Sequence, residues 1–244
     1  MTGTPLLDRV ALVTGGASGI GQACCELFTQ LGALAFSLDV DAHASFVADV
    51  AEGAGVDDAV DAIVRDYGRI DVLVHCAGIG SVGTVESFDE REWERLFAVN
   101  VYGIARVTKA ALPALRRSRY PSIVLIGSIA GSVGLPSRAA YAASKGAVHA
   151  LGLAMAADLV QEGIRVNVVA PGTTDTPWVA RLLATSTEPA AERRALEARQ
   201  PFGRLLTASE VAGAVAYLAS GASLATTGTI LAVDGGMAGL RLRS

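Results

Sequence analysis

The chain has 244 residues, and its 27 glycines make up about 11% of it against a usual ~7%. Hydrophobic residues account for 51% and charged residues for 18%, which excludes a disordered chain and suits one large α/β domain. Glycine shows no triplet repeat and no apolar run reaches membrane-spanning length, so collagen-like and membrane classes are also excluded. A formal net charge of −4 without a long basic run argues against nucleic acid as a partner.

The amino-terminal segment MTGTPLLDRVALVTGG lacks the basic stretch, apolar core and cleavage site of an export signal, so we expect a cytoplasmic protein. The three cysteines, Cys24, Cys25 and Cys76, lie in apolar stretches without CxxC spacing. This pattern predicts reduced, buried thiols, and we expect no metal site.

Apolar runs of strand length alternate with segments of helix length from one end of the chain to the other. Strands are predicted at Val10–Thr14, Leu34–Leu38, Ile70–His75, Ser122–Ile126, Ile164–Val169 and Thr229–Val233. Helices are predicted at Gly19–Leu31, Asp57–Tyr67, Asp89–Arg117, Ala140–Glu162 and Ala208–Ser220. Continuously apolar strands are typical of a parallel sheet covered on both faces, which predicts a doubly wound α/β fold in a single domain over residues 1–244.

Local signals refine the ends of these elements. Ser87 and Thr207 each precede a Glu by three residues, which predicts capping boxes with Glu90 and Glu210. Only six residues separate Asp39 from the short strand candidate Phe46–Val47. That is too few for a helical crossover, so we expect an abbreviated third strand.

Residues 173–201 form a second irregular region, with Pro177, Trp178, Pro189 and a charged helix candidate at Glu188–Arg199. Long excursions from compact α/β domains often cover a site. We interpret this region as a lid over the substrate.

The first predicted strand runs directly into the sequence TGGASGIG, residues 14–21, and then into a helix. Glycines at such a junction allow a tight turn and a close approach of the backbone, and the helix N-terminus attracts an anion. The junction therefore predicts a cradle for the pyrophosphate of a dinucleotide.

Asp39 closes the second predicted strand, 24 residues after Gly15. A carboxylate at this point accepts hydrogen bonds from the adenosine ribose and repels a 2′-phosphate. Because neither residues 16–21 nor the residues directly after Asp39 include Lys or Arg, we expect NAD rather than NADP.

Tyr141 and Lys145 are spaced i, i+4 on a predicted helix, so their side chains share one face. A cation beside a phenol favours the phenolate, which predicts a lowered Tyr pKa and proton exchange with an alcohol or a carbonyl. Taken alone, the same spacing fits a packed ring beside a solvated Lys.

These features occur together over essentially the whole chain. They are TGGASGIG, Asp39, Asp49-Val50, Asn100, Ser128, Tyr141-xxx-Lys145, Pro171-Gly172 and Val233-Asp234-Gly235-Gly236. In order and spacing the chain resembles the short-chain dehydrogenase/reductase family. The resemblance implies a Rossmann-like fold and hydride transfer between a nicotinamide and a secondary alcohol or ketone.

The resemblance also implies roles for individual residues. Tyr141 is the expected general acid/base, Lys145 lowers its pKa and binds the nicotinamide ribose, Ser128 orients the substrate oxygen, and Asn100 holds a relay water. The expected cofactor contacts are Gly15, Ser18, Gly19, Ile20 and Gly21 with the pyrophosphate, Asp39 with the ribose, Asp49 and Val50 with adenine, Ala77 and Gly78 by backbone approach, and Pro171, Gly172, Thr174 and Thr176 with the nicotinamide.

The chain departs from the family pattern after the fourth strand, where His75-Cys76-Ala77-Gly78 replaces the usual Asn-Asn-Ala-Gly. His75 is either a catalytic base or, as we expect, a structural or adenosine-side residue. The shortened segment after Asp39 is a second departure, and it alters the expected adenine pocket.

Arginines give the hint about the substrate. Arg138, Arg181 and Arg199, with Arg204 nearby, are expected to converge on a carboxylate, which favours a small hydroxy acid or a sugar-derived acid. The alternatives are a 3-oxoacyl-acyl-carrier-protein reductase, a neutral sugar or polyol dehydrogenase, and a dinucleotide-sensing subunit without turnover. If the chain forms the homotetramer common in the family, Arg241-Leu242-Arg243 is expected to reach a neighbouring site; a dimer is the other expected assembly.

Overall fold

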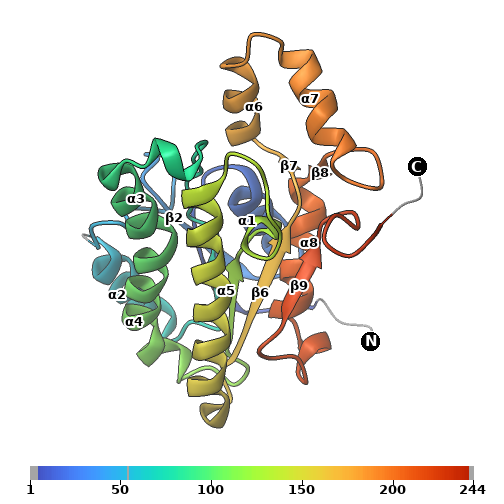
Figure 1. The fold of residues 1–244 in the computed structure, drawn as a ribbon. Coiled ribbons are helices and arrows are strands. Elements are labelled where there is room, and N and C mark those ends of the chain that lie inside the picture. Colours follow the sequence, from blue (N-terminus) through green and yellow to red (C-terminus); the bar gives the residue numbers. More distant parts are fainter. Residues whose placement is uncertain (1–4, 54, 242–244) are drawn as a thin grey trace.

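A computed structural model describes residues 5–53 and 55–241 and shows seven parallel strands in one central sheet (Figure 1). The strands lie in the order β3-β2-β1-β4-β5-β6-β9. Their bounds are β1 Val10–Thr14, β2 Leu34–Asp39, β3 Phe46–Val47, β4 Val72–His75, β5 Ser122–Ile126, β6 Arg165–Pro171 and β9 Ile230–Val233. The doubly wound parallel sheet expected from the sequence is confirmed, as is the abbreviated third strand.

Helices cover both faces of this sheet. On one face lie α2 (Val56–Tyr67), α4 (Gly103–Leu115) and α5 (Ala139–Leu159), and on the other lie α1 (Gly19–Gln30) and α8 (Ala208–Ala219). Successive side chains of β1 point to opposite faces, so Leu12 packs with the first group of helices and Val13 with the second. Burial on both sides explains why the strands are apolar without interruption.

The long helix predicted at Asp89–Arg117 is interrupted. It consists of α3 (Glu90–Phe97), a π-helical turn at Ala98–Tyr102 and α4. The Ser87 cap was wrong, because the Asp89 side chain accepts the Arg91 N–H at 2.9 Å and caps α3 instead. Ser87 ends a 3₁₀ turn and donates its hydroxyl to the Thr84 carbonyl.

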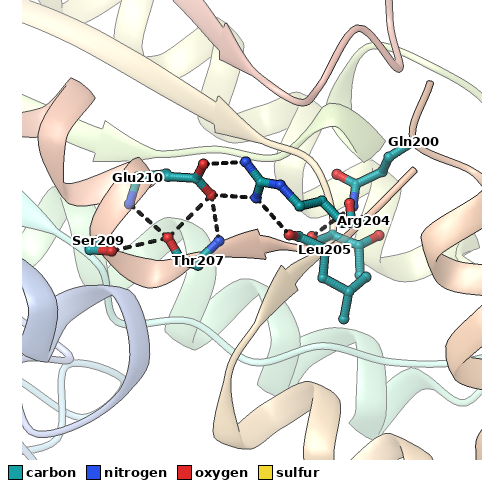
Figure 2. Close-up of polar contacts among 7 residues, drawn as sticks. Gln200, Arg204, Leu205, Thr207, Ser209 and Glu210 are labelled. Carbon is teal, nitrogen blue, oxygen red and sulfur yellow. Dashed lines mark hydrogen bonds and ion pairs between the residues drawn. The ribbon is translucent and has the colours of Figure 1, made fainter. Parts of the chain in front are cut away.

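The second predicted capping box, at the start of α8, is confirmed. Thr207 Oγ1 accepts the Glu210 N–H at 3.2 Å, and the Glu210 carboxylate accepts the Thr207 N–H at 2.8 Å (Figure 2). The Arg204 guanidinium donates to both oxygens of the same carboxylate, at 2.9 and 2.6 Å. These bonds lower the pKa of Glu210 to about 2, so the carboxylate stays ionised at neutral pH.

Residues 173–201 leave the main sheet at its carboxyl end. They contain β7 (Thr174–Asp175), which pairs with β8 (Leu206–Thr207), and the helices α6 (Pro177–Ala184) and α7 (Pro189–Ala198). Figure 1 shows α6 and α7 projecting beyond the sheet as a helical pair. A separate apolar cluster of Val179, Leu196 and Leu205 holds this pair together.

Two smaller predictions can be compared with the structure. The cysteines are free, and only Cys24 is fully buried; burial raises the pKa of the Cys25 thiol to about 12. Among the described residues, no helix is long and apolar enough to cross a lipid bilayer.

Candidate active site

A cavity of about 1010 Å³ lies at the carboxyl ends of the strands, next to the point between β1 and β4 where the strand order reverses. This is where open α/β sheets bind ligands. The cavity lining includes the predicted cofactor and substrate residues: Gly15, Ser18, Gly19, Ile20, Gly21, Asp39, Asp49, Val50, Ala77, Gly78, Ser128, Arg138, Tyr141, Lys145, Pro171, Gly172, Thr174, Thr176, Arg181 and Arg199. Asn100 is not among them.

The glycine loop after β1 is shaped for a ligand that approaches the backbone closely. Gly15 has φ +65°, and a Cβ there would lie 2.7 Å from the Ala77 backbone nitrogen. A Cβ on Gly21 would overlap the Gly15 carbonyl oxygen. The Ser18 side chain makes no capping bond at the start of α1, so it does not compete with a ligand for the first N–H groups of the helix. The loop therefore fits a pyrophosphate.

The end of the cavity near β2 is acidic. Residues 38–52 contribute the carboxylates of Asp39, Asp49 and Glu52 to the lining, and none of the lining residues in this range is a Lys or Arg. Asp39 Oδ2 accepts the Ala17 N–H at 3.1 Å, which ties the end of β2 to the glycine loop. A carboxylate held here fits the two hydroxyls of an unphosphorylated ribose.

Three predicted catalytic side chains meet at the other end. Ser128 follows β5, and Tyr141 and Lys145 lie in the first turns of α5. The Lys145 ammonium lies 5.9 Å from the centroid of the Tyr141 ring and donates to the Ile126 carbonyl at 2.9 Å. All three residues line the cavity.

The expected electrostatics of this group need a correction. Burial raises the pKa of Tyr141, and hydrogen bonding from Ser128 and the charge of Arg138 oppose that rise. Burial also lowers the pKa of Lys145 to about 8. The pKa of Tyr141 thus lies above its ordinary value rather than below it, and the cation that opposes the rise is Arg138 rather than Lys145.

Asn100 lies in the π-helical turn, outside the cavity lining, and is 1% exposed. Its Nδ2 donates to the Ile79 carbonyl and to Ser144 Oγ, both at 3.0 Å, and its Oδ1 accepts the Ile79 N–H at 2.9 Å. Ser144 belongs to α5, so Asn100 joins the loop after β4 to the helix that carries Tyr141.

His75, the departure from the family pattern, does not reach the cavity. Its Nε2 lies 2.9 Å from Thr108 Oγ1 on α4, and the side chain is buried. Burial lowers the pKa of His75 to about 3, so the ring is neutral at physiological pH. This environment is that of a structural histidine.

The arginines separate into two groups. Arg138 is half-buried, donates to the Ser81 carbonyl at 3.1 Å and lines the cavity; the exposed Arg181 and Arg199 line it as well. Arg204 does not line the cavity, because its guanidinium is paired with Glu210 (Figure 2). The expectation that Arg204 joins the substrate arginines was wrong.

The C-terminal arginines are only partly described. Arg241 donates to the Leu240 carbonyl at 2.9 Å, whereas Leu242 and Arg243 lie outside the described residues.

Sequence reasoning placed Trp178 in the lid but did not single it out as a site residue. Trp178, at the start of α6, lines the cavity with its ring 6.4 Å from that of Tyr141 and nearly parallel to it, at 16°. Gly80 lies directly against the indole. The available signal was an isolated Trp in an aromatic-poor chain, just after the Thr174–Thr176 contact segment.

Comparison with known proteins agrees with this geometry. Residues 15–238 match the family described as Enoyl-(Acyl carrier protein) reductase. The chain is 38% identical to 2-(S)-hydroxypropyl-CoM dehydrogenase 3 of Xanthobacter autotrophicus, covering 95% of this chain and 97% of that protein. It is also 38% identical to cis-4-hydroxycyclohexanecarboxylate dehydrogenase of Sinomonas cyclohexanicum, covering 96% and 98%.

Among solved structures, the aldohexose dehydrogenase of Thermoplasma acidophilum in ligand-free form superposes with a TM-score of 0.91 at 36% identity, covering 98% of this chain and 97% of that one. The chain belongs to the short-chain dehydrogenase/reductase family. It is an oxidoreductase that acts on secondary alcohols with a nicotinamide dinucleotide.

Proposed function

We propose that the protein is an NAD-dependent dehydrogenase of a small hydroxy acid or sugar-derived acid. The observation that carries the proposal is that Arg138, Arg181 and Arg199 line the same cavity as Tyr141 and Ser128. A substrate with a carboxylate near its secondary hydroxyl matches this combination of charge and proton-transfer groups.

In the proposed reaction, Ser128 holds the substrate oxygen and the Tyr141 hydroxyl oxygen takes the proton of the alcohol. When bound, the nicotinamide dinucleotide supplies the hydride acceptor. Lys145 Nζ and Asn100 Oδ1 both border Gly78, at 3.5 and 3.3 Å from where a Cβ on that residue would stand, so a proton-carrying group and an acceptor face the same point of the loop after β4. Both side-chain N–H groups of Asn100 are used by the protein, so a relay water held by Asn100 would donate to one of its oxygens.

The raised pKa of Tyr141 has a consequence for direction and pH. A neutral phenol donates a proton to a ketone, whereas oxidation of an alcohol requires the phenolate. Alcohol oxidation should therefore become faster as the pH rises towards the pKa of Tyr141, and ketone reduction should be favoured at lower pH.

The proposed preference for NAD rests on the acidic cavity end. Asp39, Asp49 and Glu52 would repel a 2′-phosphate, and none of the lining residues between 38 and 52 offers a compensating cation. An acyl-carrier-protein reductase is less well supported, since the chain has a net charge of −4 and an acidic carrier protein requires a basic docking face.

A neutral sugar is the second candidate substrate, favoured by the aldohexose dehydrogenase named among the similar structures. NAD and NADP reduction should be followed with 3-hydroxybutyrate, a sugar acid, an aldohexose and a polyol. We expect the acids to give the highest kcat/KM and NAD to be the better cofactor. Higher kcat/KM with the neutral compounds, or with NADP, would remove the corresponding half of the proposal.

The arginine pair Arg138 and Arg204 provides a matched control. Arg138→Ala should lower kcat/KM for the acids by about ten- to a hundredfold, since hydrogen bonds to charged groups contribute ~1.5–3 kcal/mol. Arg204→Ala removes the same charge outside the cavity and should leave the ratio of acid to neutral substrate unchanged. Equal losses in the two variants would exclude direct recognition by Arg138.

A further inference from the structure

The indole of Trp178 occupies a position that neither the glycine loop nor the catalytic residues require. It comes from α6, in the excursion outside the main sheet, yet its ring lies 6.4 Å from the Tyr141 ring at an interplanar angle of 16°. The guanidinium carbon of Arg138 lies 5.8 Å from the centroid of the same indole. One side chain thus adjoins both the proposed proton acceptor and the proposed anion-binding group.

The loop after β4 accommodates the indole because Gly80 has no side chain. A Cβ on Gly80 would lie 2.7 Å from Cε2 of Trp178 and 3.0 Å from Nε1. Real Cβ atoms do not approach other heavy atoms this closely, so any larger residue at position 80 would displace the ring. Gly80, in the loop after β4, is therefore the residue against which the indole of Trp178 packs.

The first residues of the lid segment are also held in place. The Thr176 methyl carbon and Pro177 Cδ lie 3.5 and 3.8 Å from where a Cβ on Gly19 would stand, so the start of α6 packs over the glycine loop. Val179, the residue after Trp178, is buried in the cluster with Leu196 and Leu205. The indole is consequently held between a fixed helix start and a fixed loop.

We propose that Trp178, packed against Gly80, is the specificity-determining residue that limits the size of the substrate. A substrate that contacts Arg138 with its anion and presents its hydroxyl to Tyr141 must pass along the indole. The ring then leaves room for short, unbranched hydroxy acids and excludes a bulky group on the reacting carbon. This inference rests on the proposed function for the identity of the anion, but the size limit applies equally to neutral alcohols.

The test measures kcat/KM with two pairs of substrates that differ in bulk: 3-hydroxybutyrate against 3-hydroxy-3-phenylpropanoate, and 2-butanol against 1-phenylethanol. Trp178→Ala should raise the ratio of bulky to small substrate at least about tenfold in each pair that is turned over. Trp178→Phe should give an intermediate ratio. Trp93→Ala, the matched control, removes the other tryptophan, which contacts Phe88 and does not line the cavity. It should leave the ratio unchanged.

A second readout does not depend on turnover. In a Trp93→Phe background Trp178 is the only tryptophan, since the chain has two. The fluorescence emission of Trp178 should respond to NADH. Adding Gly80→Ala should make the indole more accessible to the quencher acrylamide, because the new Cβ displaces the ring. An emission that is insensitive to both changes would overturn the placement, even if no substrate were found.

The outcomes distinguish the two proposals. Turnover of neutral alcohols only, with the size ratio still altered by Trp178→Ala, would refute the hydroxy-acid assignment and support the size limit. Turnover of acids with a ratio that stays within about twofold in Trp178→Ala, well short of the effect of one methylene, would overturn the role of Trp178.

Discussion

The two ends of the cavity are built by different means. At the cofactor end, backbone groups of the glycine loop and the ends of buried strands form the walls, and a Cβ added to Gly15 or Gly21 would collide with the neighbouring backbone. At the substrate end, long side chains on α5, α6 and the loop after α7 form the walls, and Arg181 and Arg199 are exposed. The first end suits one invariant ligand, whereas the second can change its substrate by exchanging side chains.

Tyr141 belongs to both ends, and its replacement should have the largest effect. Tyr141→Phe removes the hydroxyl that exchanges the proton, so kcat should fall by about 10²- to 10⁴-fold. The cavity walls remain, and NADH binding measured by fluorescence should persist. A drop of less than a few-fold in kcat would favour the alternative of a dinucleotide-binding subunit whose chemistry lies elsewhere.

A glycine pair tests the cofactor end. Gly21→Ala forces a Cβ against the Gly15 carbonyl oxygen, so NADH affinity should fall at least about tenfold, a loss of ~1.4 kcal/mol or more. Gly213→Ala, an exposed position of α8 with no atom within 4 Å of the added Cβ, should instead stabilise the helix by about 0.5–1 kcal/mol. Isothermal titration and thermal unfolding measure the two effects.

If Gly21→Ala bound NADH normally, the close packing of the loop would not be what shapes the cofactor end. If Gly213→Ala lost affinity to the same degree, the effect would be one of general stability and the comparison between the two ends would fail.

The substrate end can be tested through pH. The charge of Arg138 lowers the pKa of Tyr141 against the effect of burial, so Arg138→Ala should move the pH profile of alcohol oxidation to higher pH. The pH dependence of kcat/KM with a neutral alcohol isolates this effect from anion binding. A profile unmoved in Arg138→Ala would show that Arg138 acts on the substrate alone.

His75 should have the smallest effect on catalysis. Its folded-state pKa, about 3, lies below the ordinary histidine pKa of 6.5, so the unfolded chain binds a proton first and stability falls as the pH drops from 6.5 towards 3. His75→Asn should flatten that acid dependence of unfolding while leaving the pH profile of activity in place. Loss of a titration near pH 6.5 from the activity profile would instead identify His75 as a catalytic base.

The residues predicted for the cofactor end line one cavity, and the sequence signals that pointed to them are local. A strand, a glycine turn and a helix start are consecutive, and Asp39 is the last residue of the next strand. Apolar runs likewise predicted six strands of the parallel sheet, since burial on both faces leaves a continuous pattern.

The substrate end was harder to predict because its determinants are distant in sequence. Arg204 was grouped with the arginines near the substrate, but its side chain pairs with Glu210 six residues away. The π-helical turn around Asn100 breaks a helical pattern that the sequence shows as unbroken. The contact between Gly80 and Trp178 joins two segments about a hundred residues apart, and no local pattern in the sequence predicts this contact.

The central claim is that the cavity oxidises an alcohol whose neighbouring acid group is held by arginine. It is tested most directly by comparing kcat/KM for 3-hydroxybutyrate and for its methyl ester, with NAD, in the wild-type protein. The account predicts that the free acid is preferred by about tenfold or more, because the ester loses its charge-assisted bonds. An ester oxidised as well as the acid would contradict it.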